Sequence, residues 1–312
     1  MKKKIKPINT KSPAFKFNQI SKKSNALFTV IFLLIALSCI IPLVFVIIIS
    51  FTHKDSIAEI GYSFFPKKWT LDAYKYLWDS RVIILKSFAI SIFVTVFGTL
   101  LGLFLNSTMG YVLSRRNFKF KKLYTYIVFI PMVFNGGMVA NYLVMTKLLD
   151  LKNNILALIL PIAVASFYVI ILRTFFTTTI PDSIIESGKI DGAGQIRIFY
   201  TLVLPISLPA IATIGLFLSF SYWNDWFHAL MYLNERDLFP LQYVLIQIEK
   251  NIEFMASGSS HLGISASEIL AKMPAESTKM ALVVLAVIPI AASYPFFQKY
   301  FVSGLTVGAV KG

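Results

Sequence analysis

The sequence has few charged residues and a single cysteine. Only 14% of its 312 residues are charged and 56% are hydrophobic, whereas roughly a quarter of the residues of a soluble globular protein are charged. This composition excludes an ordinary soluble domain and indicates an all-α protein that crosses a membrane several times. The lone Cys39 lies in an apolar run, which excludes a disulfide framework and a thiolate metal site.

Motifs for catalysis and nucleotide binding are also lacking. His53, His228 and His261 are scattered, with no second ligand at metal-binding spacing, so we expect no metal site. No GxxxxGK[ST] run occurs, so we expect the chain itself not to hold the phosphates of ATP. No Ser/His/Asp arrangement stands out, and we predict that the chain is not an enzyme and binds no cofactor. The net charge of +15 comes from bases beside apolar runs, which favours a membrane partner over nucleic acid.

Long uncharged runs predict about six transmembrane helices. Each run is long enough to cross the hydrocarbon core of a bilayer. The predicted spans are 26–51, 82–106, 123–147, 154–177, 198–223 and 280–302. The first span follows a basic tail, residues 1–25, and lacks a small-residue cleavage site. We therefore expect a retained span and not a signal peptide.

The distribution of basic residues predicts the orientation of the chain. The tail holds eight lysines and no acid, and the loop between the second and third spans holds five bases and no acid. By contrast, residues 225–279 include seven acids and four bases. Because basic loops stay in the cytoplasm, we predict cytoplasmic termini, external loops at 52–81 and 225–279, and a cytoplasmic loop at 178–197.

The segment 181–209 is a polar, turn-rich island between two apolar spans. Pro181 suits the first turn of a helix, and the helix dipole favours an acid such as Asp182 there. Asp191 and Gly192 are typical of the turn that ends such a helix, and we expect a second short helix to follow. The segment therefore predicts a small knob that projects from the bilayer and fits a groove of another protein.

The same island carries an ordered motif. It reads Glu186-Ser187-Gly188, Asp191-Gly192-Ala193, Phe199, Leu204-Pro205 and Pro209. This order and spacing resemble the Glu-Ala-Ala loop of permease subunits in binding-protein-dependent ABC importers. The resemblance implies the type I importer permease fold. It also implies that these residues couple to an ATPase subunit: Glu186, Ser187, Gly188, Asp191, Gly192 and Ala193. The family usually has two alanines in place of Ser187-Gly188, and glycine costs a helix about 1 kcal/mol relative to alanine.

The C-terminal tail, residues 303–312, is similar to the tail of carbohydrate permeases of the MalG type, which reaches the ATPase dimer. The implied contact residues are Gly304, Leu305, Thr306, Gly308 and Lys311. The resemblance implies import of a sugar, expected to be an oligosaccharide, across a bacterial cell membrane. The implied partners are a second homologous permease, two cytoplasmic ATPase subunits that bind ATP and Mg²⁺, and an extracytoplasmic sugar-binding protein.

Polar and aromatic residues in or beside the predicted spans are candidates for the substrate pathway. Asn135 and Asn141 border a Gly-Gly pair in the third span, which could mark a break that lines the pathway. Close packing by small residues explains the glycines equally well. Tyr222, Trp223 and Asn224 end the fifth span, where an interfacial aromatic belt is the favoured alternative.

Two other functions are compatible with parts of this pattern. An ABC permease for a peptide, amino acid or polyamine would share the loop at 181–209. A secondary carrier or channel would work without an ATPase, but should show ionisable residues within the membrane or a repeated half. The sequence shows neither. We therefore predict that residues 26–312 form the transmembrane domain of an ATP-driven sugar importer.

Overall fold

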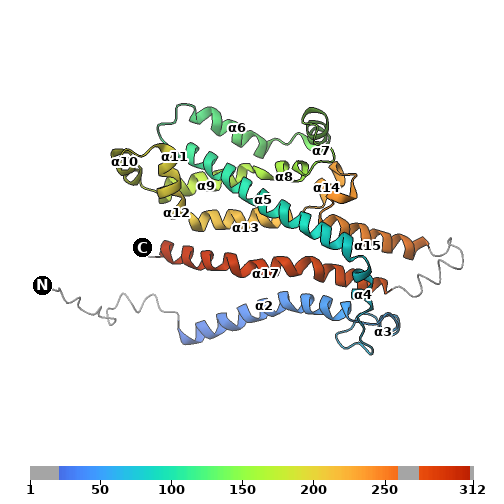
Figure 1. Ribbon diagram of the computed structural model, residues 1–312. Coiled ribbons are helices and arrows are strands. Elements are labelled where there is room, and N and C mark those ends of the chain that lie inside the picture. Colours follow the sequence, from blue (N-terminus) through green and yellow to red (C-terminus); the bar gives the residue numbers. More distant parts are fainter. Residues whose placement is uncertain (1–20, 259–273, 310–312) are drawn as a thin grey trace.

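The computed structural model describes residues 21–258 and 274–309, and this part of the chain is helical (Figure 1). Within it, the one bridge between extended segments joins Thr52 and Trp69. Three helices are long and apolar enough to cross a membrane. They are α2 (Lys22–Ser50), α5 (Arg81–Ser114) and α17 (Ala275–Ala309). These helices confirm the first, second and sixth predicted spans.

Two further spans are bent. The fourth consists of α8 (Leu156–Ala163) and α9 (Ser166–Thr179), which meet at 47°. In the fifth, the segment Gln195–Ile206 meets α13 (Leu208–Trp223) at 84°. That segment comprises α11 (Gln195–Ile198), the π-helical turn η2 (Phe199–Val203) and α12 (Leu204–Ile206). Prolines within α12 and α13 have no backbone N–H to donate, which favours the sharp bend.

The third predicted span is not one helix. It is divided into α6 (Lys121–Val133), α7 (Gly137–Leu143) and the π-helical turn η1 (Val144–Leu148). At the break, Gly137 has φ +84° and its N–H donates to Asn135 Oδ1 at 2.9 Å. Both features favour a turn. By length and composition the described residues therefore hold up to five spans. Helices α6 and α7 lie along the bundle in Figure 1, and a crossing of the membrane by this segment stays a prediction.

The connections gather at the two ends of the bundle. Figure 1 places α10 (Asp182–Ile190) and α11 at the same end as the start of α2 and the end of α17. The opposite end carries α3 (Lys54–Ile60), α4 (Asp72–Asp79), α14 (Phe227–Tyr232), η3 (Arg236–Leu238) and α15 (Leu241–Gly258). This grouping agrees with the predicted alternation of loops. That the end with α10 is cytoplasmic stays a prediction.

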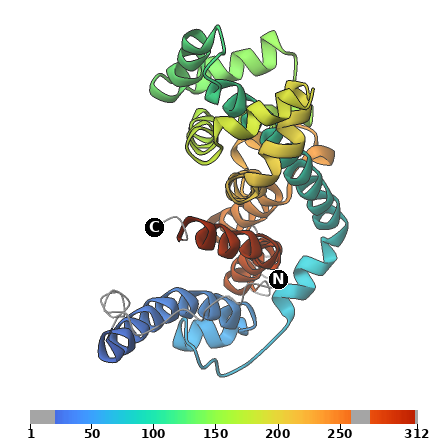
Figure 2. The ribbon, with the colours of Figure 1, turned by 90° about the vertical axis from the view of Figure 1, so that its left-hand side faces the viewer.

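The core lies where α5, α9 and α13 pack together. It contains fully buried Leu172, Phe176, Ile214 and Leu218. Figure 2, seen from the end that carries α10, shows α17 between α2 and the rest of the bundle. Outward-facing side chains of α2 are apolar and exposed, among them Phe32 at 67%. Such a surface suits a lipid environment.

Candidate coupling element and pathway cavity

Helix α10 has the local structure that the sequence predicts. Pro181 is its N-cap, and Asp182 lies in its first turn. At the other end Gly192 has φ +77°, a conformation that glycine adopts at little cost. The N–H of Ala193 donates to the carbonyl of Gly188 at 2.9 Å, which closes the turn. Helix α11 then begins at Gln195, so the predicted helix, turn and second helix are confirmed.

Charged and aromatic contacts hold α10 against the end of α5. The carboxylate of Asp182 lies 3.2 Å from Arg116 Nε and 3.9 Å from Arg115 Nη1. The Arg115 guanidinium lies over the Tyr111 ring, 5.1 Å from its centroid. The Tyr111 hydroxyl donates to Gln195 Oε1 at 3.3 Å. The Arg116 side chain is 85% exposed, and exposed ion pairs contribute little free energy. We therefore assign this set of contacts an orienting role.

Gly188 faces the segment that follows α10. It is buried, and a Cβ there would lie 3.1 Å from Ile198 Cγ1 and 3.1 Å from Leu202 Cδ1. Its neighbour on the same face, Ile185, is 4% exposed. Glycine thus permits close packing of α10 on α11 and η2, which accounts for Gly188 in place of the second alanine of the family motif. Nothing in the structure explains Ser187 in place of the first.

The opposite face of α10–α11 is open and partly apolar. Glu186, Ser187, Asp191 and Gly192 are exposed, and Ala193 is half-buried. The Ser187 hydroxyl turns back and donates to the Ile184 carbonyl at 2.9 Å. Two large apolar side chains are strongly exposed here, Ile190 at 85% and Ile196 at 76%. An exposed apolar surface rimmed by polar groups is typical of a protein interface.

The C-terminal candidates lie at the same end of the bundle. Gly304, Leu305, Thr306 and Gly308 form the last turns of α17, next to the end labelled C in Figure 1. Lys311 lies outside the described residues. Contact of this tail with an ATPase stays a prediction.

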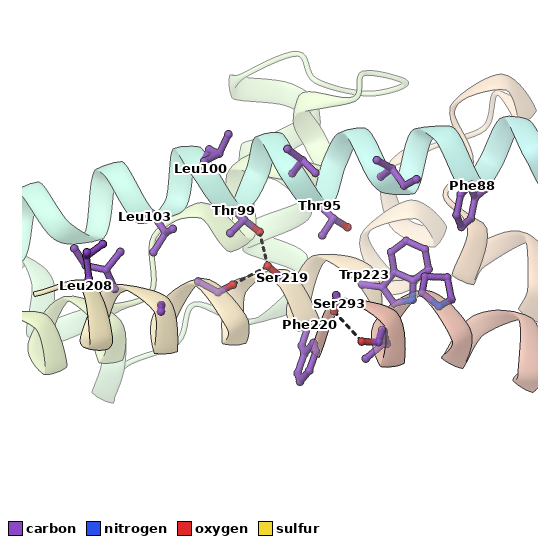
Figure 3. Close-up of a pocket in the computed structure, with 17 residues that line it drawn as sticks. Phe88, Thr95, Thr99, Leu100, Leu103, Leu208, Ser219, Phe220, Trp223 and Ser293 are labelled. Atoms are coloured by element: carbon purple, nitrogen blue, oxygen red, sulfur yellow. Dashed lines mark hydrogen bonds between the residues drawn. The ribbon is translucent and has the colours of Figure 1, made fainter. Parts of the chain in front are cut away.

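A cavity of about 690 Å³ lies between α5, α13 and α17 (Figure 3). Its lining is mostly apolar, with aromatic rings from Phe88, Phe220 and Trp223. The hydroxyl groups in the lining belong to Thr95, Thr99, Ser219 and Ser293. Ligand pockets commonly have about this size and this mixture of apolar surface with a few polar groups.

Of the three candidates that end the fifth span, only Trp223 lines this cavity. Its Nε1 donates to the Ala286 carbonyl of α17 at 3.1 Å. Tyr222 points away and donates its hydroxyl to the Ile159 carbonyl at 2.7 Å. Asn224 is exposed at the end of α13, and its Nδ2 donates to the Phe220 carbonyl at 2.9 Å. Asn135 and Asn141 are exposed and absent from the cavity lining, so their pathway role stays a prediction.

Thr95 and Thr99 make a matched test of the polar lining. Thr95 Oγ1 is buried without a hydrogen-bond partner in the described part of the chain, whereas the hydroxyls of Thr99 and Ser219 are bonded at 3.2 Å. Thr95→Val should therefore leave the melting temperature unchanged or raise it. Thr99→Val should lower the free energy of unfolding by about 1 kcal/mol, because it removes this hydrogen bond, although Ser219 still donates to the Gly215 carbonyl at 2.7 Å. Thermal melts of both variants check this, and equal losses would contradict it.

One residue that shapes the wall around the core was not predicted from the sequence. Asn106 is fully buried and joins α5 to the break between α8 and α9. Its Nδ2 donates to the carbonyls of Gly102 and Ala163 at 2.6 and 2.7 Å. Its Oδ1 accepts from the N–H of Ala165 at 3.2 Å. An amide inside an apolar run is unusual, and this was the signal in the sequence that could have identified it.

Comparison with known proteins decides the family. The family described as "Binding-protein-dependent transport system inner membrane component" matches residues 98–307. The chain belongs to this family. It is therefore a multi-pass membrane permease of a transport system, and the resemblance drawn from the loop at 186–209 is confirmed.

Several relatives of this permease are similar along nearly their whole length. It is 41% identical to the polygalacturonan/rhamnogalacturonan transport system permease protein YtcP of Bacillus subtilis, over 90% of this chain and 95% of the relative. It is 28% identical to the arabinooligosaccharides transport system permease protein AraQ of Halalkalibacterium halodurans, over 92% and 96%. A chain of the crystal structure of a bacterial ABC transporter involved in the import of the acidic polysaccharide alginate superposes with a TM-score of 0.77. The two chains are 26% identical, and the match covers 91% of this permease and 100% of the alginate transporter chain.

Proposed function

We propose that this permease forms half of the translocation pathway of an ATP-driven oligosaccharide importer in a bacterial cell membrane. The observation that supports this proposal most strongly is the family match over residues 98–307. The sugar substrate is supported by the names of relatives, which include transporters for polygalacturonan and arabinooligosaccharides. The proposed partners are a second homologous permease, two ATPase subunits that bind ATP and Mg²⁺, and an external sugar-binding protein.

In this proposal the exposed face of α10–α11 docks into a groove of an ATPase subunit. Ile190 and Ile196 would supply apolar contact area, and Glu186 would supply a charged contact beside them. When the ATPase subunits close on ATP, α10 would move with them. Rigid-body rotation of the spans would then open the pathway alternately to the two sides.

The cavity between α5, α13 and α17 is the proposed sugar pathway on this subunit. Aromatic faces such as those of Phe220 and Trp223 can pack on sugar rings, and the threonine and serine hydroxyls can exchange hydrogen bonds with sugar hydroxyls. Among the residues that the structure describes, none of the lining side chains is charged. The second permease would close the open side of the cavity.

The test is ATP hydrolysis by the assembled transporter in nanodiscs, with the binding protein loaded from a panel of oligosaccharides. We expect one loaded sugar to stimulate hydrolysis, and Glu186→Arg to abolish this stimulation while the subunits still co-purify. Lys122→Glu reverses an exposed charge at the same end of the bundle, and as the control it should retain stimulation. Stimulation by a loaded peptide or amino acid would refute the sugar substrate. Uptake that follows an ion gradient, with no ATPase bound, would refute the importer.

A further inference from the structure

A cluster of basic residues lies where α5, α6 and α9 approach the end of the bundle that carries α10 (Figure 1). Its members are Arg115, Arg116, Lys119, Lys121, Lys122 and Arg173. Asp182 bridges the first two of these. Within residues 21–258 and 274–309, the other four form no ion pair shorter than 4.0 Å with an acid. The cluster therefore carries an excess of positive charge.

Lys121 and Arg173 form the inner part of this cluster. Lys121 Nζ donates to the Arg115 carbonyl at 3.3 Å, and Arg173 is half-buried with no acidic partner among the described residues. Partial burial lowers the pKa of Lys121, and the positive charges of three nearby arginines lower it further. An anion placed between Lys121 and Arg173 would relieve this repulsion.

An apolar hollow adjoins Arg173. Arg173 lines a hollow of about 170 Å³ between α5, α6 and α9. The other lining residues are Leu113, Thr125, Val128, Phe129 and Ile170. The Thr125 hydroxyl already donates its proton to the Lys121 carbonyl at 2.7 Å, so it is not a free donor for a ligand. What the hollow offers a ligand is therefore a hydrocarbon surface next to a positively charged rim.

Exposed aromatic residues place this rim at the depth of lipid headgroups. Phe120, Tyr124 and Tyr126 surround the first turns of α6 and are 54%, 46% and 62% exposed. Aromatic side chains concentrate at the membrane–water interface. Lysine and arginine near helix ends extend their charged groups to the same level.

We propose that Lys121 and Arg173 bind the phosphate of an anionic phospholipid in the leaflet at this end, with part of an acyl chain in the adjoining hollow. Charge complementarity selects an anion, and the apolar hollow selects a lipid over inorganic phosphate. Basic pockets between transmembrane helices are suited to such headgroups.

The test uses the full-length chain purified in detergent and titrated with dioleoylphosphatidylglycerol or dioleoylphosphatidylcholine. We expect the anionic lipid alone to raise the melting temperature saturably, and native mass spectrometry to detect it bound. The double variant Lys121→Gln/Arg173→Gln should bind it about 100-fold more weakly, since the loss of each charge-assisted contact to the phosphate lowers affinity roughly tenfold. Arg173→Lys keeps the charge and should keep most of the binding.

The matched control is Lys119→Gln/Lys122→Gln, which removes the same charge from exposed positions of the cluster. It should retain binding of the anionic lipid. Equal weakening in the control would overturn the proposal in favour of a diffuse surface charge. Equal effects of the two lipids, or the same stabilisation by millimolar inorganic phosphate, would overturn it as well. If the double variant does not fold, the single variant Lys121→Gln decides, with an expected loss of about tenfold.

Discussion

Asn106→Leu should prevent most of the permease from folding. The leucine side chain would leave the Ala163 carbonyl and the Ala165 N–H without the bonds that Asn106 now provides. Both groups flank the break between α8 and α9. No hydrogen bond of a helix backbone takes the place of the two lost bonds there. Each unsatisfied buried group costs about 1–3 kcal/mol, so the expected loss is about 2–6 kcal/mol. Fluorescence-detected size exclusion and thermal melts of the purified chain measure this loss.

Asn135→Leu is the matched control for this prediction. Asn135 makes a single local bond, accepting from Gly137 N–H, and its surroundings are exposed. We expect the control to lose less than 1 kcal/mol. If both variants melt like the original chain, Asn106 does not stabilise the break.

Gly98→Ala should destabilise the contact between α5 and α13. A Cβ at this position would lie 2.5 Å from Tyr222 Cζ and 2.7 Å from both Cε atoms. The ring has little freedom to move, because Tyr222 is 2% exposed and its hydroxyl donates to the Ile159 carbonyl. Overpacking of this kind typically costs about 1–3 kcal/mol. The melting temperature and the folded yield of the variant test the prediction.

The control and a compensating change make this result specific. A Cβ at Gly136 has its nearest neighbour at 3.5 Å, so Gly136→Ala should melt close to the original chain. Tyr222→Leu removes the ring atoms that clash, and combined with Gly98→Ala it should cost less than the two single changes together. Strict additivity of the three measurements would show that the ring is not the cause.

The sequence predicted elements whose causes are local. Helices α2, α5 and α17 follow from long uncharged runs, and α10 follows from proline, aspartate and glycine at its ends. The bend between α8 and α9 was not predicted, because the residues on both sides are equally apolar. Its stabilising amide, Asn106, lies 59 residues before Ala165. Helix α15 was expected as a mixed polar loop because its sequence combines charged and apolar residues.

In the candidate site, too, the sequence did not predict which way each side chain points. Tyr222, Trp223 and Asn224 are consecutive, and successive residues of a helix point about 100° apart. One of them faces the cavity, one is buried against α8, and one ends the helix. Composition identified this group, but only the packing of α13 on its neighbours assigns a different role to each member. The ATPase and sugar contacts themselves stay predictions.

The 84° bend before α13 has a mechanical consequence. Because Gly188 lets α10 pack on α11 and η2, these elements can move together as one unit. This unit is joined to the longer helix α13 at the bend. The pivot is near Ser207, between the two prolines. A displacement of α10 would then rotate α13 about this point and move Ser219 and Trp223 in the cavity wall.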